Sequence, residues 1–296
     1  MTTGTFADRI AALTEIRATR PGAIADAAAR RARRAVLTGA DGRLMIVAAD
    51  HPARGALGAG PDPLAMADRR DLLERLCVAL GRPGVDGVLG TPDIVEDLLL
   101  LGALDGKVVI GSMNRGGLAG ASFEIDDRFT AYSTAAIAAA GLDGGKMLLR
   151  IDDDDPATAA TLEGCANAVT DLAGRGLMAM VEPFISRRVD GRIRNELTPE
   201  AMTRAIAIAS GLGASSAHSW LKVPVVEDME RVMAASTLPA LLLGGEVSAD
   251  PEAALATWRK ALALPTVRGL VVGRSLLYPG DDDVAGVVDA AVEVLR

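Results

Sequence analysis

Short runs of aliphatic residues alternate with longer amphipathic runs along most of the chain. This alternation is typical of βα units, in which a covering helix follows each strand of a parallel sheet. The runs that predict strands are Leu44–Ala49, Gly87–Leu89, Val108–Ser112, Lys146–Ile151, Leu177–Glu182, Ser219–Val223, Ala240–Leu243 and Leu270–Val272. The helices predicted after them are Pro63–Leu80, Pro92–Leu101, Asp127–Ala140, Pro156–Ala173, Pro199–Gly211, Val226–Ala235, Pro251–Leu262 and Asp283–Leu295. Eight such units predict one closed (β/α)₈ barrel, a TIM barrel of the α/β class.

The segment before the first predicted strand has helical spacing. We expect residues 1–40 to form a helical extension, with one or two helices between Gly4 and Ala35 packed outside or under the barrel. The whole chain, residues 1–296, is then a single domain, because barrels of this kind reach this length. An open, doubly wound sheet is the competing architecture. It would normally carry a Gly-rich fingerprint after its first strand, where this chain has Asp50-His51-Pro52.

Composition excludes several classes of protein. Half of the residues are hydrophobic but only 3% are aromatic, which is the composition of an α/β enzyme rather than a disordered chain. The net charge of −8 argues against binding to nucleic acid or to an anionic membrane surface. No apolar run is long enough to span a bilayer, and the N-terminus does not read as a signal peptide. We expect a cytoplasmic protein in which Cys77 and Cys165 are free thiols.

Four charged residues stand at the ends of predicted strands. Because alternate residues of a barrel strand point inward, Asp50, Lys146, Glu182 and Lys222 are expected to project into a common interior. An ion-pair network that only fills the barrel would explain them without catalysis. An ion-pair network could be built with Arg as well as with Lys. The chain has only four lysines among its 31 basic residues, so a network of this kind would be expected to contain Arg. The choice of Lys favours amine chemistry, since a desolvated Lys can attack a carbonyl whereas Arg stays charged.

Glycines follow the last two predicted strands. Gly244 and Gly245 come after the seventh strand, and Gly273 and Arg274 come after the eighth. Glycine lets backbone N–H groups approach an anion, and Arg neutralises its charge. In barrels of this fold a phosphate commonly binds at these two loops. The four residues therefore predict a phosphate-binding site.

We predict no metal site. The two histidines, His51 and His218, have no partners at metal-ligand spacing, and we interpret both as structural or supporting residues. The run Asp152–Asp155 is interpreted as a solvated turn that caps the next helix rather than as a cation site.

Six short motifs carry a resemblance to a known family. They are I-V-A-A-D (46–50), G-K-M-L-L-R (145–150), V-E-P (181–183), L-K-V-P (221–224), L-L-G-G (242–245) and V-G-R (272–274). In this order the chain resembles the class I, Schiff-base-forming aldolases of the fructose-bisphosphate and tagatose-bisphosphate type. As a whole it is similar to bacterial deoxyribose-phosphate-aldolase-like barrels, some of which are associated with inositol breakdown.

The resemblance implies a role for each strand-end residue. Lys222 would form the imine, Glu182 would shuttle protons, and Lys146 would lower the pKa of Lys222 and orient the substrate. Asp50 would handle the hydroxyl proton lost when the carbon–carbon bond breaks. No cofactor and no metal would be needed, and the partner would be a small sugar phosphate. Whether Lys222 or Lys146 forms the imine follows from the resemblance alone.

The resemblance also suggests a substrate. Leu243 stands where a serine often precedes the glycine pair, and Ser112-Met113-Asn114-Arg115 lacks the lysine of some members. Both departures fit a substrate with one phosphate and a different group at its far end. The inositol association suggests 6-phospho-5-dehydro-2-deoxygluconate, cleaved to dihydroxyacetone phosphate and malonate semialdehyde. A carboxylate clamp could come from any of four arginines on strand-end loops: Arg54, Arg115, Arg187 and Arg188.

Several alternatives stay open at this point. The chain could cleave another ketose phosphate, such as tagatose or fructose bisphosphate, sulfofructose phosphate or deoxyribose phosphate. It could instead use its amine on pyridoxal phosphate, isomerise a sugar phosphate, or bind a sugar phosphate without catalysis. We also expect a homo-oligomer, because the extra helices and the Ala- and Leu-rich helix faces could pack against a second copy.

Overall fold

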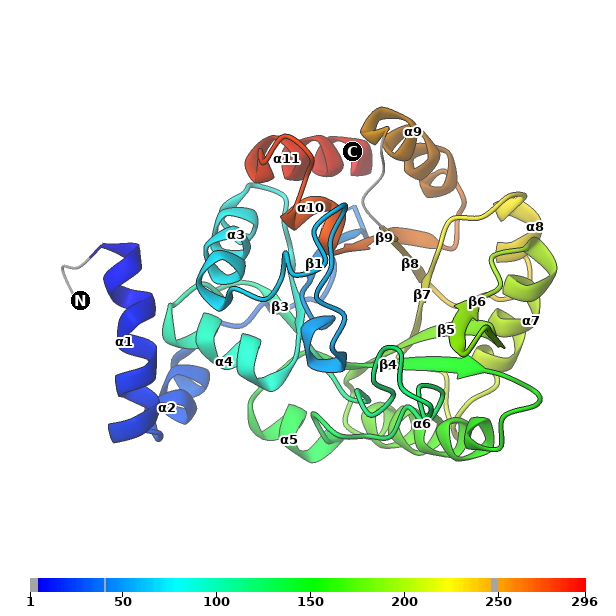
Figure 1. Cartoon of the computed structure of the whole chain (residues 1–296), viewed down its shortest axis with the longest axis horizontal. Helices are drawn as coiled ribbons and strands as arrows, with labels where there is room; N and C mark the ends of the chain where they lie inside the picture. Colours follow the sequence, from blue (N-terminus) through cyan, green and yellow to red (C-terminus); the bar gives the residue numbers. More distant parts are fainter. Residues whose placement is uncertain (1–4, 40, 246–249) are drawn as a thin grey trace.

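The computed structural model describes residues 5–39, 41–245 and 250–296. Within these ranges eight parallel strands close into a barrel, and helices surround it (Figure 1). The barrel strands are β1 (Leu44–Ala48), β2 (Gly87–Gly90), β3 (Val108–Ser112), β4 (Gly144–Ile151), β5 (Met178–Val189), β7 (Ser219–Val223), β8 (Ala240–Leu243) and β9 (Val267–Val272). They follow one another in chain order around the ring, with β9 beside β1 and β5 beside β4. The predicted (β/α)₈ barrel is confirmed.

A helix follows each barrel strand on the outside. These helices are α3 (Arg69–Gly81), α4 (Pro92–Leu100), α5 (Thr134–Ala139), α6 (Ala157–Ala173), α7 (Pro199–Ser210), α8 (Met229–Met233), α9 (Pro251–Leu262) and α11 (Val284–Leu295). Two short turns of helix lie at strand ends, namely η1 (Pro52–Arg54) after β1 and α10 (Arg274–Leu277) after β9.

Two apolar clusters hold the barrel together. One fills its interior, where Leu44, Ile46 and Ala48 of β1 pack with Met178 and Met180 of β5. The other lies between the outer face of the sheet and the helices. The inward set has the expected spacing of two residues, so the next inward positions toward the carboxyl end are Asp50 on the first strand and Glu182 on the fifth.

The N-terminal extension forms two helices, α1 (Phe6–Thr19) and α2 (Ala23–Arg30), which lie to one side of the barrel (Figure 1). The segment after them runs to the amino end of the sheet. There the buried Arg31 donates hydrogen bonds to the carbonyl oxygens of Lys107, at 2.7 Å, and Gly141, at 2.6 Å. The predicted extra helices are confirmed, while residues 1–4 and 40 of the predicted extension lie outside the described residues.

The largest differences between the predicted and the observed helix starts are at α3 and α5. α3 begins at Arg69 rather than Pro63, because Asp68 accepts hydrogen bonds from the backbone N–H groups of Arg70 and Asp71 and so caps the helix. α5 begins at Thr134 rather than Asp127, because Ser133 accepts from Ala136 N. In both cases the residues before the cap have helix-compatible side chains but belong to the preceding loop.

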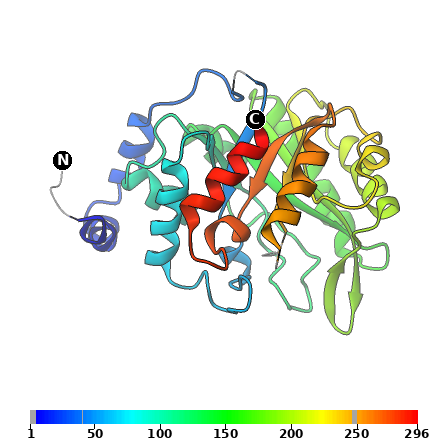
Figure 2. The same cartoon turned by 90° about the horizontal axis from the view of Figure 1, so that it is seen from above.

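The fifth strand is longer than predicted. It continues past Glu182 to Val189 and pairs with the antiparallel strand β6 (Arg192–Asn195), in a segment expected to be a connection. Figure 2 shows this hairpin projecting beyond the barrel. Asp190 and Gly191 make its turn, both with positive φ (50° and 77°), as a two-residue hairpin loop requires. The D-G dipeptide was the sequence signal for it.

Candidate active site

The four predicted catalytic residues meet at the carboxyl end of the barrel. Asp50 follows β1, while Lys146, Glu182 and Lys222 lie in β4, β5 and β7. All four side chains are buried, with exposed fractions of 1% for Asp50 and Lys146, 8% for Glu182 and 3% for Lys222. The carboxyl ends of four strands therefore bring two amines and two carboxylates into one buried cluster.

These groups form a chain of alternating charge. Lys222 Nζ lies 2.8 Å from Glu182 Oε1. The other oxygen of Glu182 pairs with Lys146, whose Nζ also lies 3.2 Å from Asp50 Oδ2. Each buried charge thus has an opposite charge beside it, which is the condition under which a protein interior tolerates ions.

Asp50 is held by further donors. Ser112 Oγ donates a hydrogen bond to Asp50 Oδ2 at 3.0 Å, and Arg115 Nη1 lies 3.2 Å from the same oxygen. Burial alone would raise the pKa of Asp50, but the cations of Lys146, Arg115 and Lys222 outweigh it and hold that pKa well below its ordinary value. Oδ2 is therefore fully engaged, and the geometry of this carboxylate is fixed.

Sequence reasoning did not assign Ser112 or Arg115 to the catalytic group, although a signal for Ser112 existed. Val108 and Ile110 of β3 belong to the interior cluster, so Ser112 is the next inward position of that strand. Arg115 lies beyond the strand, where the period of two no longer applies.

The surroundings of Lys146 and Glu182 lower the pKa of both side chains. Burial, reinforced by the Arg115 guanidinium, lowers the pKa of Lys146 to about 8 against the attraction of Asp50 and Glu182. For Glu182, burial acts to raise the pKa, but Lys146 and Lys222 prevail and lower it. At neutral pH the carboxylate is ionised, and Lys146 is a cation close to losing its proton.

His51 lies at the same edge of the site. Its Nδ1 is 3.8 Å from Asp50 Oδ1 and has no hydrogen-bond partner among the described residues. Burial lowers the pKa of His51 to about 3, despite the nearby Asp50 charge. The imidazole is therefore neutral at pH 7. The prediction that His51 is a supporting residue is consistent with its place beside Asp50.

The predicted phosphate residues lie on neighbouring loops. Gly244 and Gly245 follow β8, Gly273 and Arg274 follow β9, and these two strands are paired. A Cβ on Gly244 would lie 2.4 Å from a Val272 methyl carbon, so only glycine fits there. Arg274 Nε and Ser275 Oγ are buried, and neither has a hydrogen-bond partner in the described part of the chain. Unsatisfied donors beside a glycine turn fit a site for an oxyanion.

Other predicted features lie away from this pocket. His218 lines a cavity of about 300 Å³ with residues 33–37, where the amino ends of β3 and β5 contribute Val108 and Met178. Asp152 is buried and ion-paired with Arg187 at 3.2 Å, so the prediction of a solvated turn is wrong for this residue. Both cysteines are free, as predicted.

Metal-binding clusters and membrane-spanning helices are both absent from the described residues. These residues contain no cluster of His, Cys, Asp and Glu that could hold a metal ion. No helix within the same ranges has the length and apolarity needed to cross a membrane.

Solved structures of low sequence identity share the barrel fold of this chain. The chain is similar to a Schiff-base-forming fructose-1,6-bisphosphate aldolase, with 21% identity, coverage of 92% of this chain and 100% of that one, and a TM-score of 0.64. It is also similar to an archaeal fructose 1,6-bisphosphate aldolase, with 20% identity, coverage of 92% and 98%, and a TM-score of 0.66. At this identity the likeness shows the barrel fold.

A much nearer relative has been solved. Cgl0159 from Corynebacterium glutamicum (Brevibacterium flavum) is 53% identical over 97% of both chains, with a TM-score of 0.95. No curated protein matches this chain. A family model described as Cgl0159-like matches residues 42–292, which include the whole barrel and every residue of the site. The chain therefore belongs to the Cgl0159-like family.

Proposed function

We propose that this protein is a class I aldolase that cleaves a phosphorylated ketose through an imine on Lys222. The observation that carries the proposal is the pair of Lys222 and Glu182, an amine and a carboxylate that lie 2.8 Å apart and are both buried. A buried amine beside a proton-accepting group is the arrangement that imine formation needs, because the amine must lose a proton before it attacks a carbonyl. The solved aldolases share the fold, which supports the proposal.

Lys222 suits the imine better than Lys146 does. Lys146 lies between Asp50 and Glu182, and its ammonium group forms an ion pair with both carboxylates. Lys222 contacts Glu182 alone among the described carboxylates, and its strand pairs with β8, which Gly244 follows. A ketose whose phosphate lies at Gly244, Gly245, Gly273 and Arg274 would present its carbonyl to Lys222.

The chemistry then proceeds without an external electron acceptor. The neutral Lys222 amine adds to the carbonyl, Glu182 transfers protons, and water leaves to give a protonated imine. This imine accepts the electron pair of the breaking carbon–carbon bond, while the adjacent hydroxyl loses its proton and becomes the aldehyde. Asp50 would take that proton through Oδ1, since Oδ2 is engaged by Ser112, Arg115 and Lys146. Protonation of the enamine and hydrolysis release the ketone and restore Lys222.

The finer assignment within this proposal is 6-phospho-5-dehydro-2-deoxygluconate as substrate, with dihydroxyacetone phosphate and malonate semialdehyde as products. A retro-aldol screen of ketose phosphates, coupled to detection of dihydroxyacetone phosphate, tests it. Wild-type protein should release this product from 6-phospho-5-dehydro-2-deoxygluconate, and Lys222→Arg should release none while remaining folded. Equal release by the variant would refute the assignment of Lys222. The homo-oligomeric state stays a prediction.

A further inference from the structure

Arg115 has an unused donor inside the pocket. Its Nε donates to Asn114 O at 2.8 Å, and its Nη1 lies 3.2 Å from Asp50 Oδ2. Its Nη2 is buried, and no acceptor in residues 5–39, 41–245 or 250–296 bonds to it. The whole residue is 5% exposed. A buried charged donor without an acceptor is costly, and a ligand that supplies an acceptor would remove that cost.

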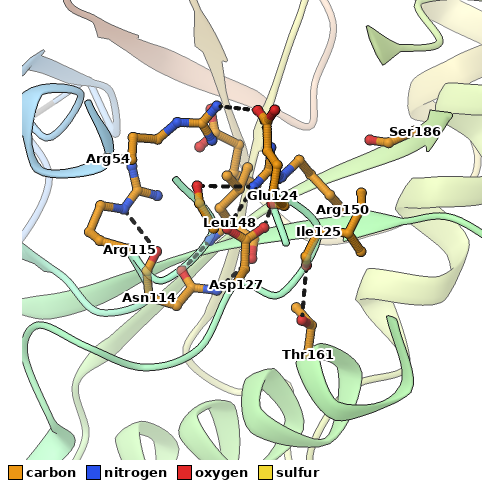
Figure 3. Close-up of polar contacts among 12 residues, drawn as sticks. Arg54, Asn114, Arg115, Glu124, Ile125, Asp127, Leu148, Arg150, Thr161 and Ser186 are labelled. Carbon is orange, nitrogen blue, oxygen red and sulfur yellow. Dashed lines mark hydrogen bonds and ion pairs between the residues drawn. The ribbon is translucent and has the colours of Figure 1, made fainter. Parts of the chain in front are cut away.

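The charges around Arg115 leave one cation in excess. Arg150, at the end of β4, pairs with Glu124 at 3.0 Å and Asp127 at 2.8 Å. Arg54, after β1, pairs with the same Glu124 at 3.3 Å (Figure 3). These two arginines balance the two carboxylates, while in the catalytic group Asp50 and Glu182 balance the two lysines. Arg115 is the cation left over.

The excess of positive charge affects the pKa of Arg54. Burial, together with the nearby cations of Arg150 and Arg115, lowers the pKa of Arg54 to about 10. The guanidinium groups therefore repel one another in the free protein. An anion between Arg54 and Arg115 would relieve this repulsion, and one negative charge would be enough.

The other two candidates, Arg187 and Arg188, already have partners on the loops. Arg187 of β5 pairs with Asp152, Asp153 and Glu196, and Arg188 lies 3.7 Å from Asp155 and donates to Ser122 O at 2.8 Å. Both are more exposed than Arg115 and belong to the hairpin that projects from the barrel. They connect loops to one another rather than facing the pocket residues.

The position of Arg115 matches the far end of a bound substrate. In the ring of eight strands, three strands separate β3 from β8 on either side, so the two lie opposite each other. A ligand with its phosphate at Gly244 and Gly245, after β8, and its carbonyl at Lys222 extends across the pocket toward Arg115, after β3. Asp50, which Arg115 contacts, lies beside the bond that breaks in the proposed reaction.

We propose that Arg115, assisted by Arg54, binds a carboxylate at the end of the substrate that leaves as the aldehyde. This inference rests on the proposed aldolase function and adds the residues that bind the carboxylate of the aldehyde. A carboxylate carries the single negative charge that the cluster lacks, and its planar pair of oxygens suits a guanidinium edge. A phosphate dianion would exceed the available positive charge.

The test compares aldehydes in the synthetic direction. Wild type, Arg115→Gln and the control Arg187→Gln are each assayed for addition of dihydroxyacetone phosphate to 3-oxopropanoate, to propanal and to glyceraldehyde 3-phosphate. We expect wild type to prefer 3-oxopropanoate in kcat/KM. In Arg115→Gln, kcat/KM for 3-oxopropanoate divided by kcat/KM for propanal should fall by about 10- to 100-fold. This is the effect expected from the loss of one charged hydrogen bond. Arg187→Gln should leave the ratio unchanged.

The ratio isolates binding of the carboxylate, because any effect of Arg115 on Asp50 changes both aldehydes alike. An unchanged ratio in Arg115→Gln would overturn the proposal. So would a wild-type preference for glyceraldehyde 3-phosphate that Arg115→Gln abolishes, which would assign the subsite to phosphate.

A binding measurement separates this inference from the proposed function. Calorimetric titration with 3-hydroxypropanoate needs no imine, and its affinity should fall about tenfold or more in Arg115→Gln. If this fall occurs and no imine forms with dihydroxyacetone phosphate, the subsite stands and the aldolase assignment fails. If an imine forms but the affinity is equal in both proteins, the subsite fails and the aldolase assignment stands.

Discussion

Glu182 Oε1 lies 2.8 Å from Lys222 Nζ, and this contact leaves the second oxygen of Glu182 for Lys146. One carboxylate therefore connects the two amines of the barrel. A proton released by Lys222 has an acceptor in direct contact, and the positive charge of Lys146 keeps that acceptor ionised.

Glu182→Gln tests the role of this connection. Glutamine keeps the shape of the side chain but cannot take up and return protons, so kcat for cleavage should fall about 10²- to 10⁴-fold. Product release measured under saturating substrate gives the value. Glu196→Gln, on the exposed hairpin connection, is the matched control and should behave as wild type. Activity of Glu182→Gln within twofold of wild type would show that another group moves the protons.

Arg150→Met tests the buried network at the end of β4. Arg150 is 2% exposed, and its removal leaves the buried Glu124 and Asp127 without their main partner. The free energy of unfolding should fall by about 3–5 kcal/mol. Arg128→Met is the control, because Arg128 is 77% exposed and forms a surface ion pair with Asp126, so its loss should cost less than about 1 kcal/mol. Denaturant unfolding of the three proteins at pH 7 measures both values, and similar losses would contradict this account.

Replacement of Gly117 by a larger residue should also destabilise the fold. A Cβ at this position would lie 2.3 Å from Glu124 O and 2.5 Å from both Arg150 Nη2 and Asp127 Oδ1. Gly117→Ala must therefore displace the loop that Arg150 holds, and it should lower the free energy of unfolding by at least about 1–3 kcal/mol. Gly120→Ala, where nothing lies within 4 Å, separates this clash from a general cost of replacing glycine, since only its backbone angle (φ of 79°) opposes the change. A smaller loss at Gly117 than at Gly120 would argue against a tightly packed loop.

His51→Gln tests the neutral state of the imidazole. The pKa of His51 is about 3 in the folded protein and near 6.5 when unfolded, so between these values the unfolded chain binds more protons. This histidine therefore makes folding less favourable as pH falls below about 6.5. Wild type should lose up to about 1.4 kcal/mol per pH unit more than His51→Gln between pH 6.5 and 4.5. Unfolding curves at several pH values measure the difference, and parallel pH dependence would show that His51 becomes protonated freely in the folded state.

The barrel and the position of the candidate catalytic residues were predictable because periodicity alone places them. The spacing of two along each strand puts Lys146, Glu182 and Lys222 inside, and chain order sets their strands β4, β5 and β7 side by side. The helix starts after Asp68 and Ser133 were missed because Asp62, before Pro63, and Asp126 offer the same kind of capping side chain. The sequence pattern does not show which candidate caps the helix. Arg115 was one of four candidates, since only folding decides which guanidinium groups find partners in the loops.

The most direct test of the central claim is reduction of the protein with borohydride in the presence of dihydroxyacetone phosphate, followed by peptide mass spectrometry. We predict an irreversible adduct on the peptide that contains Lys222. This adduct should be absent in Lys222→Arg, and Glu182→Gln should form it in a smaller amount than wild type. An adduct on Lys146 instead, or no adduct on the folded wild-type protein, would contradict the account.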